Sequence, residues 1–124
     1  MGDPRHDLGI AAEEAAARWL EAEGWRILGR RQRSRSGGEV DVVALDPAGV
    51  LVAIEVRARR TGRAGSGSET INARRTARTG RTLADFAAGS GIAHAGLRID
   101  LVTVAPLPGP VGRWRLRRIP DIGA

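Results

Sequence analysis

Two short apolar segments of this chain each carry a carboxylate, and a four-residue turn separates them. Asp41 lies in the first segment, and Glu55 lies in the second, where Val56 and Arg57 follow it. Burying an unpaired carboxylate is costly, so such groups are normally ion-paired, hydrogen-bonded or bound to a metal. Because the carboxylates come from neighbouring segments and an arginine follows the second one, the pattern predicts a metal and phosphate site.

The segments around these carboxylates have the pattern of a β-hairpin. Both are rich in β-branched residues, and the sequence Asp-Pro-Ala-Gly between them is typical of a turn. Successive side chains of a strand point to opposite faces. We therefore expect Glu55 to share a face with Arg57. In the first strand we expect Asp41 to lie opposite Val40 and Val42.

The rest of the chain is expected to complete one α/β domain over residues 1–124, in the order helix, three strands, helix, two strands. The first helix is expected over residues 8–23, between Asp7 as its N-cap and Gly24 as its end. The second helix should begin at the capping-box pattern of residues 66–69 and end at Gly89. The other strands are expected at residues 25–33, 97–105 and 113–119. Two segments are expected to be flexible, residues 1–7 and residues 60–67.

Charge and composition narrow the class of partner. The net charge is +6, the pI is about 11.5, and all 20 basic residues are arginines, which favours nucleic acid. The chain has no cysteine, which excludes disulfides and cysteine-based zinc sites and fits a reducing compartment. No apolar run is long enough to span a bilayer, and the N-terminus lacks a signal-peptide pattern. We therefore expect a cytoplasmic protein with no membrane partner.

Three groups of arginines could contact a phosphate backbone. They are the stripe Arg74, Arg75, Arg78 and Arg81, the cluster Arg30, Arg31, Arg33 and Arg35, and the segment with Arg57, Arg59, Arg60 and Arg63. A single run of charge is usually a solvated face, but three runs in a basic chain favour contact with nucleic acid. The last predicted strand also alternates arginines with Trp114 and Leu116, which suits a sheet edge.

The order of these motifs resembles that of a known family. The motifs are Gly9…Glu13-x-x-Ala16-x-x-Trp19-Leu20, Gly24 to Leu28, Gly38 to Asp41, Glu55 to Arg59 and Arg98 to Asp100. The series is similar to the YraN-like uncharacterised bacterial proteins, which resemble Holliday junction resolvases of the PD-(D/E)xK nuclease superfamily. It extends over about a hundred residues, so it is fairly specific for a fold. The resemblance implies a restriction-endonuclease-like fold with a central mixed sheet flanked by helices.

The resemblance also implies a Mg²⁺- or Mn²⁺-dependent endonuclease that acts on DNA more than on RNA. Asp41 and Glu55 would bind the metal, and Arg57 would contact the scissile phosphate. Glu13 would be an accessory ligand or position a water molecule, and Glu39 would support Asp41. Arg57 stands where the superfamily usually has lysine, and an arginine cannot act as a base because it stays charged. Arg75 likewise replaces an expected lysine.

Each candidate residue also has a structural interpretation. Asp41 could be a hydrogen-bonded strand residue, and Glu13 could pair with an arginine at the edge of its helix's apolar stripe. Glu39 could be a solvated charge. The ion pairs that would explain the remaining carboxylates are Glu55 with Arg57 or Arg59, and Asp100 with Arg98.

These interpretations leave a competing function open. The protein could be a non-catalytic DNA- or RNA-binding or adaptor protein that keeps the nuclease fold, because Arg57 replaces the usual lysine. A basic ribosome-associated protein is a third possibility. A resolvase-like role would favour a homodimer, since symmetric cutting of two strands suits a two-fold assembly.

Overall fold

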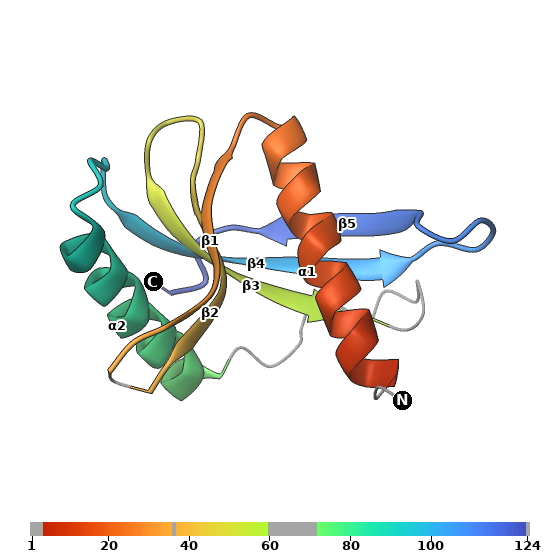
Figure 1. Ribbon diagram of the computed structural model, residues 1–124, viewed down its shortest axis with the longest axis horizontal. Coiled ribbons are helices and arrows are strands. Elements are labelled where there is room, and N and C mark those ends of the chain that lie inside the picture. Colours follow the sequence, from red (N-terminus) through yellow and green to blue (C-terminus); the bar gives the residue numbers. More distant parts are fainter. Residues whose placement is uncertain (1–3, 36, 60–71, 124) are drawn as a thin grey trace.

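The protein consists of a five-stranded mixed sheet and two helices, as the computed structural model in Figure 1 shows. The structure describes residues 4–35, 37–59 and 72–123. The elements are α1 (Pro4–Ala22), β1 (Arg26–Arg33), β2 (Glu39–Leu45), β3 (Leu51–Ala58), α2 (Ala73–Ser90), β4 (Leu97–Pro106) and β5 (Trp114–Ile119). The strands lie side by side in chain order, with β3 and β4 parallel and the other neighbouring pairs antiparallel. The predicted order of helices and strands is confirmed.

The two helices cover opposite faces of the sheet (Figure 1). α1 packs on the face that carries Val52 and Ile54 of β3, and α2 packs on the face that carries Leu51 and Ala53. All four side chains are fully buried, as expected for a central strand covered on both sides. The alternation predicted for this strand is therefore confirmed, and it places the Glu55 side chain on the α2 face.

β2 does not keep one alternation along its length. Val40 packs on the α2 face and Val42 on the α1 face, so the prediction that they share a face is wrong. In the ladder between β1 and β2, Arg30 pairs with Val42 and Gln32 with Val40, and the register shifts between Ile27 and Gly29. Arg31 and Asp41 are not paired in this ladder, and Arg31 has a left-handed backbone with φ of 51°. β2 also pairs with β3 only from Val42 onwards. Asp41 therefore lies where β2 separates from β3.

The first helix begins earlier than the sequence predicts. It starts at Pro4, and proline suits the first helical position because its φ is fixed and no backbone N–H is needed there. The segment from Pro4 to Asp7 is therefore part of the helix, and Asp7 is not its N-cap. Residues 1–3 lie outside the described part, and the flexibility expected for residues 1–7 stays a prediction. The predicted end is confirmed, since Gly24 has φ of 90° and its N–H donates to the carbonyl of Glu21.

The second helix begins and ends at other residues than predicted. Asn72 is its N-cap, and the Oδ1 atom of Asn72 accepts the N–H groups of Arg74 at 3.0 Å and Arg75 at 3.2 Å. At the other end the helix continues past Gly89 and ends at Gly91, which has φ of 66°. The predicted capping box and mobile loop lie outside the described residues, at 66–69 and 60–67.

β5 forms one edge of the sheet, as its alternating basic pattern predicts. Trp114 and Leu116 are half-buried against the α1 side of the core, and Arg113, Arg115 and Arg117, which alternate with them, are exposed. Among the described residues, no helix has the length and apolar character needed to cross a membrane.

Candidate functional site

Three carboxylates from three elements come together where β2 separates from β3. Glu13 belongs to α1, Asp41 to β2 and Glu55 to β3, and both glutamates repel the charge of Asp41. We call these three residues the acidic site. Because Glu13 lies on the helix that covers one face and Glu55 points to the other face, Asp41 stands between carboxylates from both sides of the sheet.

The carboxylate of Asp41 accepts a backbone hydrogen bond from β3 beyond the end of the β2–β3 ladder. Its Oδ2 atom accepts the backbone N–H of Val56 at 2.8 Å, at the point where the ladder between β2 and β3 has stopped. Burial raises the pKa of Asp41 to about 6; the Val56 hydrogen bond works against this shift, and the charge of Glu13 adds to it. The carboxylate is thus held in place while its charge remains poorly compensated.

Glu55 is buried and is oriented by the second helix. The hydroxyl of Thr79 donates to its Oε1 atom at 2.8 Å, and the Nε atom of Arg75 lies 3.7 Å from the same oxygen. Glu55 is 6% exposed, whereas the Arg75 side chain is 58% exposed and extends to the surface. Glu55 is therefore ion-paired, as the structural interpretation predicts, but its partner among the described residues is Arg75 and not Arg57 or Arg59.

Glu13 is bound by the first strand. The Nε atom of Arg31 lies 3.0 Å from its Oε1 atom, and a nitrogen of Arg30 lies 3.9 Å from the same oxygen. The hydrogen bond to Glu13 raises the pKa of Arg31, and the charges of Glu39 and Asp41 raise it further. Arg31 is therefore the guanidinium that faces the acidic site from β1.

The conformation of Arg31 carries an energetic cost. A left-handed backbone at a residue other than glycine costs about 1–2 kcal/mol, so the surrounding contacts must maintain it. The same conformation interrupts the β1–β2 ladder beside Asp41. The backbone strain and the break in the sheet thus coincide with the acidic site. The predicted pairing of Glu13 with an arginine is confirmed, and the pair lies within the site.

The remaining predicted residues lie around this centre. Arg57 is half-buried on the face of Glu55, opposite Thr103 of β4. Glu39 is exposed and pairs with Arg33 at 3.0 Å, which agrees with a solvated charge at the strand end. Arg59 donates its backbone N–H to Val104. The exposed arginines of α2 are Arg74, Arg75, Arg78 and Arg81. Two predicted residues, Arg60 and Arg63, lie outside the described part of the chain.

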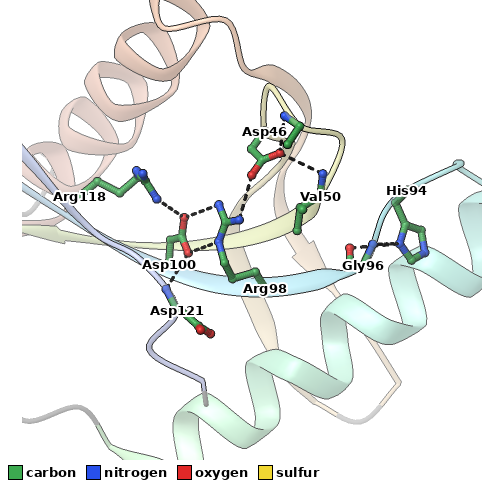
Figure 2. A network of polar contacts seen from close by, with 9 residues as sticks. Asp46, Val50, His94, Gly96, Arg98, Asp100, Arg118 and Asp121 are labelled. Carbon is green, nitrogen blue, oxygen red and sulfur yellow. Dashed lines mark hydrogen bonds and ion pairs between the residues drawn. The ribbon is translucent and has the colours of Figure 1, made fainter.

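A different buried carboxylate, Asp100, is fully surrounded by donors (Figure 2). Arg98 donates to both of its oxygens at 2.8 and 3.0 Å, Arg118 donates at 2.9 Å, and the N–H of Asp121 donates at 2.9 Å. Arg98 also reaches Asp46 at 2.8 Å. Its pairing with Arg98 confirms the structural interpretation of Asp100.

The comparison with known proteins assigns the chain to a family. Residues 12–104 match the model of the Uncharacterised protein family UPF0102. The chain belongs to the UPF0102 family. The UPF0102 protein of Symbiobacterium thermophilum is 43% identical over 112 residues, which cover 90% of this chain and 92% of that protein. The UPF0102 protein of Anaeromyxobacter dehalogenans is 42% identical over 103 residues, which cover 83% of this chain and 75% of that protein. A further UPF0102 protein, from Leifsonia xyli, is 36% identical over 100 residues, which cover 81% of this chain and 83% of that protein.

Membership of UPF0102 confirms the resemblance to the YraN-like proteins. The matched residues include the whole acidic site and end at Val104 in β4, before β5. The names of these UPF0102 relatives state no activity, so the chemistry of the site must be argued from its own geometry.

The donors of the acidic site suit a hard divalent cation that keeps much of its water. Within residues 4–35, 37–59 and 72–123, no three carboxylate or imidazole groups are arranged as a complete metal-binding cluster. Mg²⁺ is often held by one or two carboxylates, with water and substrate phosphate completing its shell. Asp41 and Glu55 could provide such a pair, and a cation there would favour the ionised form of Asp41, whose pKa is raised mainly by burial and further by the charges of Glu13 and Glu55.

Sequence reasoning missed two residues that contact the acidic site. Thr79 follows Arg75 by four residues and so lies on the same helix face, a spacing that could have linked it to Glu55. A threonine in a helix gives no signal of burial in the sequence, yet Thr79 is only 2% exposed. Arg31 was assigned to a basic cluster and not to the site, because its left-handed backbone depends on contacts with α1 that are distant in sequence.

Proposed function

We propose that this UPF0102 protein binds nucleic acid and has the active site of a Mg²⁺- or Mn²⁺-dependent DNA endonuclease on a restriction-endonuclease-like fold. The observation that carries the proposal is Asp41, a carboxylate in the opening between two strands whose pKa is raised to about 6. Strongly shifted ionisable groups in such positions are typical of functional sites. The mixed sheet with a hairpin that bears Asp41 and Glu55 agrees with the proposed fold.

The residues of the acidic site have separate roles in this proposal. Asp41 and Glu55 hold the divalent cation, which when bound neutralises phosphate charge and activates water. The Val56 N–H keeps Asp41 in one orientation, and the Thr79 hydroxyl does the same for Glu55. A carboxylate that is already oriented loses little freedom when a ligand binds.

The charged groups beside these carboxylates act on the substrate. Arg57, on the face of Glu55, contacts the scissile phosphate and stabilises the charge that develops there. Glu13, held by Arg31, positions the attacking water. Because arginine stays protonated, Arg57 contributes an electrostatic effect and the proton of water passes to another acceptor.

The exposed face of α2 gives the substrate backbone a basic surface. Arg74, Arg78 and Arg81 are all exposed, and Arg75 connects this stripe to Glu55. Phosphate contacts of this kind supply sequence-independent affinity that falls as salt rises. The α2 stripe therefore holds the nucleic acid while the acidic site acts on one phosphodiester.

A cleavage assay tests the proposal. Single-stranded, duplex, flap and four-way junction DNA would be incubated with the protein and either Mg²⁺ or Mn²⁺. We expect metal-dependent cutting by the wild type and none by Asp41→Ala or Glu55→Ala. Glu21→Ala, which removes an exposed carboxylate of α1, is the matched control and should cut normally. Cutting that persists in both site variants would contradict the proposed nuclease.

A non-catalytic nucleic-acid-binding protein is the second candidate, and Arg57 is the observation that favours it. A lysine at this position can exchange a proton, whereas an arginine cannot. Such a protein would bind DNA or RNA without cutting. Asp41→Ala would then leave its affinity unchanged or increase it, because the substitution removes negative charge near the phosphates.

A further inference from the structure

One face of the sheet edge carries Arg115 and Arg117 of β5 together with Arg113, which directly precedes the strand. Trp114 and Leu116 pack toward α1, so Arg113, Arg115 and Arg117, which alternate with them, point to the opposite face. All three are exposed. We call them the β5 arginine row. The row therefore lies on the same side of the sheet as α2 and Glu55.

The strand register connects this row to the acidic site. Arg117 lies opposite Thr103 of β4, and Thr103 lies opposite Arg57 of β3. Neighbouring strands are about 4.8 Å apart, so the backbones of Arg57 and Arg117 are separated by roughly 10 Å. Arg115 continues the row along β5, opposite Ala105. Basic side chains thus extend from Arg57 to the sheet edge on a single face.

The charges of the row are available to a ligand. In the described part of the chain, no carboxylate forms an ion pair with Arg113, Arg115 or Arg117. Arg118 differs from them, because it points to the α1 face and binds Asp100 at 2.9 Å. One strand therefore carries a structural arginine on one face and arginines without an acidic partner on the other.

The spacing of the row suits a phosphodiester backbone. Alternate residues of a strand are about 6.7 Å apart, and three of them form a straight row of roughly 13 Å. Successive phosphates along an extended strand are spaced similarly, and Arg can bind each phosphate through two N–H groups.

We propose that the β5 arginine row binds the backbone of one nucleic-acid strand and directs it across the sheet face to the acidic site. The inference rests on the proposed function and adds a second binding surface on the side of the site away from the α2 stripe. The row lies beyond residues 12–104, so the family match does not include it. A substrate held on both sides of Glu55 would have its scissile phosphate fixed between two anchored segments.

The salt dependence of DNA binding tests the row. Binding of a short fluorescent duplex and of its single strand would be measured in EDTA over a range of salt concentrations. Losing two phosphate contacts in R115Q/R117Q should reduce the slope of log K against log salt by about 1.8 for duplex and about 1.4 for the single strand. The control R18Q/R26Q removes the same charge from exposed residues of α1 and of the far end of β1, and its slope should match the wild type.

A second readout locates the contact independently of affinity. The chain has no cysteine, so R115C and R26C each introduce a unique thiol. Bound DNA should slow the modification of the thiol at position 115 and leave that at position 26 unaffected. If the wild type shows no salt-dependent binding to DNA, the proposed function and the row both fail. If the wild type binds but R115Q/R117Q keeps the wild-type slope, the row alone is overturned.

Discussion

Asp41 and Asp100 are both carboxylates in strands of the same sheet, yet their surroundings differ. Asp100 is completely buried and accepts hydrogen bonds from Arg98, Arg118 and the backbone of Asp121. Asp41 accepts one backbone N–H from the described residues. Burial is the main cause of its raised pKa; the charges of Glu13 and Glu55 add to this shift, and the charge of Arg75 works against it. The protein therefore compensates the charge of Asp100 fully and the charge of Asp41 poorly.

The difference shows that burial alone does not identify a functional carboxylate. Arg98 donates to both Asp100 and Asp46. The guanidiniums of Arg98 and Arg118 lie over the Trp25 ring, at 5.8 and 5.3 Å from its centroid. These contacts form a closed network that stabilises the fold. In the acidic site Arg31 pairs with Glu13 and Arg75 with Glu55. Burial raises the pKa of Asp41 more than the charge of Arg75 lowers it, so a cation would favour the ionised carboxylate.

The largest effect should come from breaking the compensated network. Asp100→Asn leaves Arg118 without its anion and Arg98 with Asp46 alone, so the free energy of unfolding should fall by about 3–5 kcal/mol. Urea denaturation would measure it, with Asp41→Asn as the matched control. The control should change stability little or increase it, because it removes repulsion from two neighbouring carboxylates. Equal losses in the two variants would contradict the contrast between the sites.

A smaller loss is expected at the support of Glu55. Thr79→Val keeps the shape of the side chain and removes the hydroxyl that donates to the buried carboxylate. A hydrogen bond to a charged group contributes about 1.5–3 kcal/mol, so unfolding should become easier by that amount. Thr76→Val is the control, since its hydroxyl donates to a backbone carbonyl of the same helix. A neutral Thr79→Val would mean that the hydroxyl does not hold Glu55.

Cation binding at the acidic site should depend on pH through the ionisation of Asp41. A cation bound elsewhere would show no dependence on the pKa of Asp41. A proton and a cation compete for this carboxylate, so the affinity for Mg²⁺ should fall up to about tenfold per pH unit below 6. Folding raises the pKa of Asp41 from 3.8, so its contribution to stability is greatest below that value and declines as pH rises to about 6. Calorimetric titration with Mg²⁺ between pH 5 and 7 would check the first effect; a constant affinity would contradict it.

The smallest effect should be the exchange of one cation for another beside the acidic site. If the role of Arg57 is electrostatic, Arg57→Lys should change the cleavage rate by only a few-fold, while Arg57→Ala should lower it far more. A large gain in rate for Arg57→Lys would instead show that the position needs a group able to exchange a proton. Rates with the metal and substrate held constant distinguish these outcomes.

Local patterns in the sequence were enough to predict much of the fold. The Asp-Pro-Ala-Gly turn and the β-branched runs predicted the hairpin. The alternation in β3 correctly predicted that Glu55 and Ile54 point to opposite faces of the sheet. Gly24 was identified as the end of α1 because a left-handed residue is needed there. Asn72 was missed because the pattern at residues 66–69 has the same capping chemistry six residues earlier.

The details of the acidic site depend on contacts that a local pattern does not contain. Val40 and Val42 follow a perfect alternation in sequence, but Arg31 on the neighbouring strand interrupts the ladder beside them. That conformation accompanies a bond to Glu13, 18 residues away. The pairing of Asp100 with Arg98 was predicted from their spacing, but the contact of Asp100 with Arg118 in another strand is one that no spacing in the sequence reveals.

The most direct test of this account is an NMR titration of the Asp41 carboxyl carbon without and with Mg²⁺, assigned by comparison with Asp41→Asn. The account predicts a midpoint near pH 6 in the absence of the cation. It also predicts that Mg²⁺ moves the midpoint to lower pH, because the cation stabilises the ionised form. A midpoint near the ordinary value of 3.8 that Mg²⁺ leaves unchanged would contradict the claim that Asp41 is the uncompensated charge of a cation-dependent site.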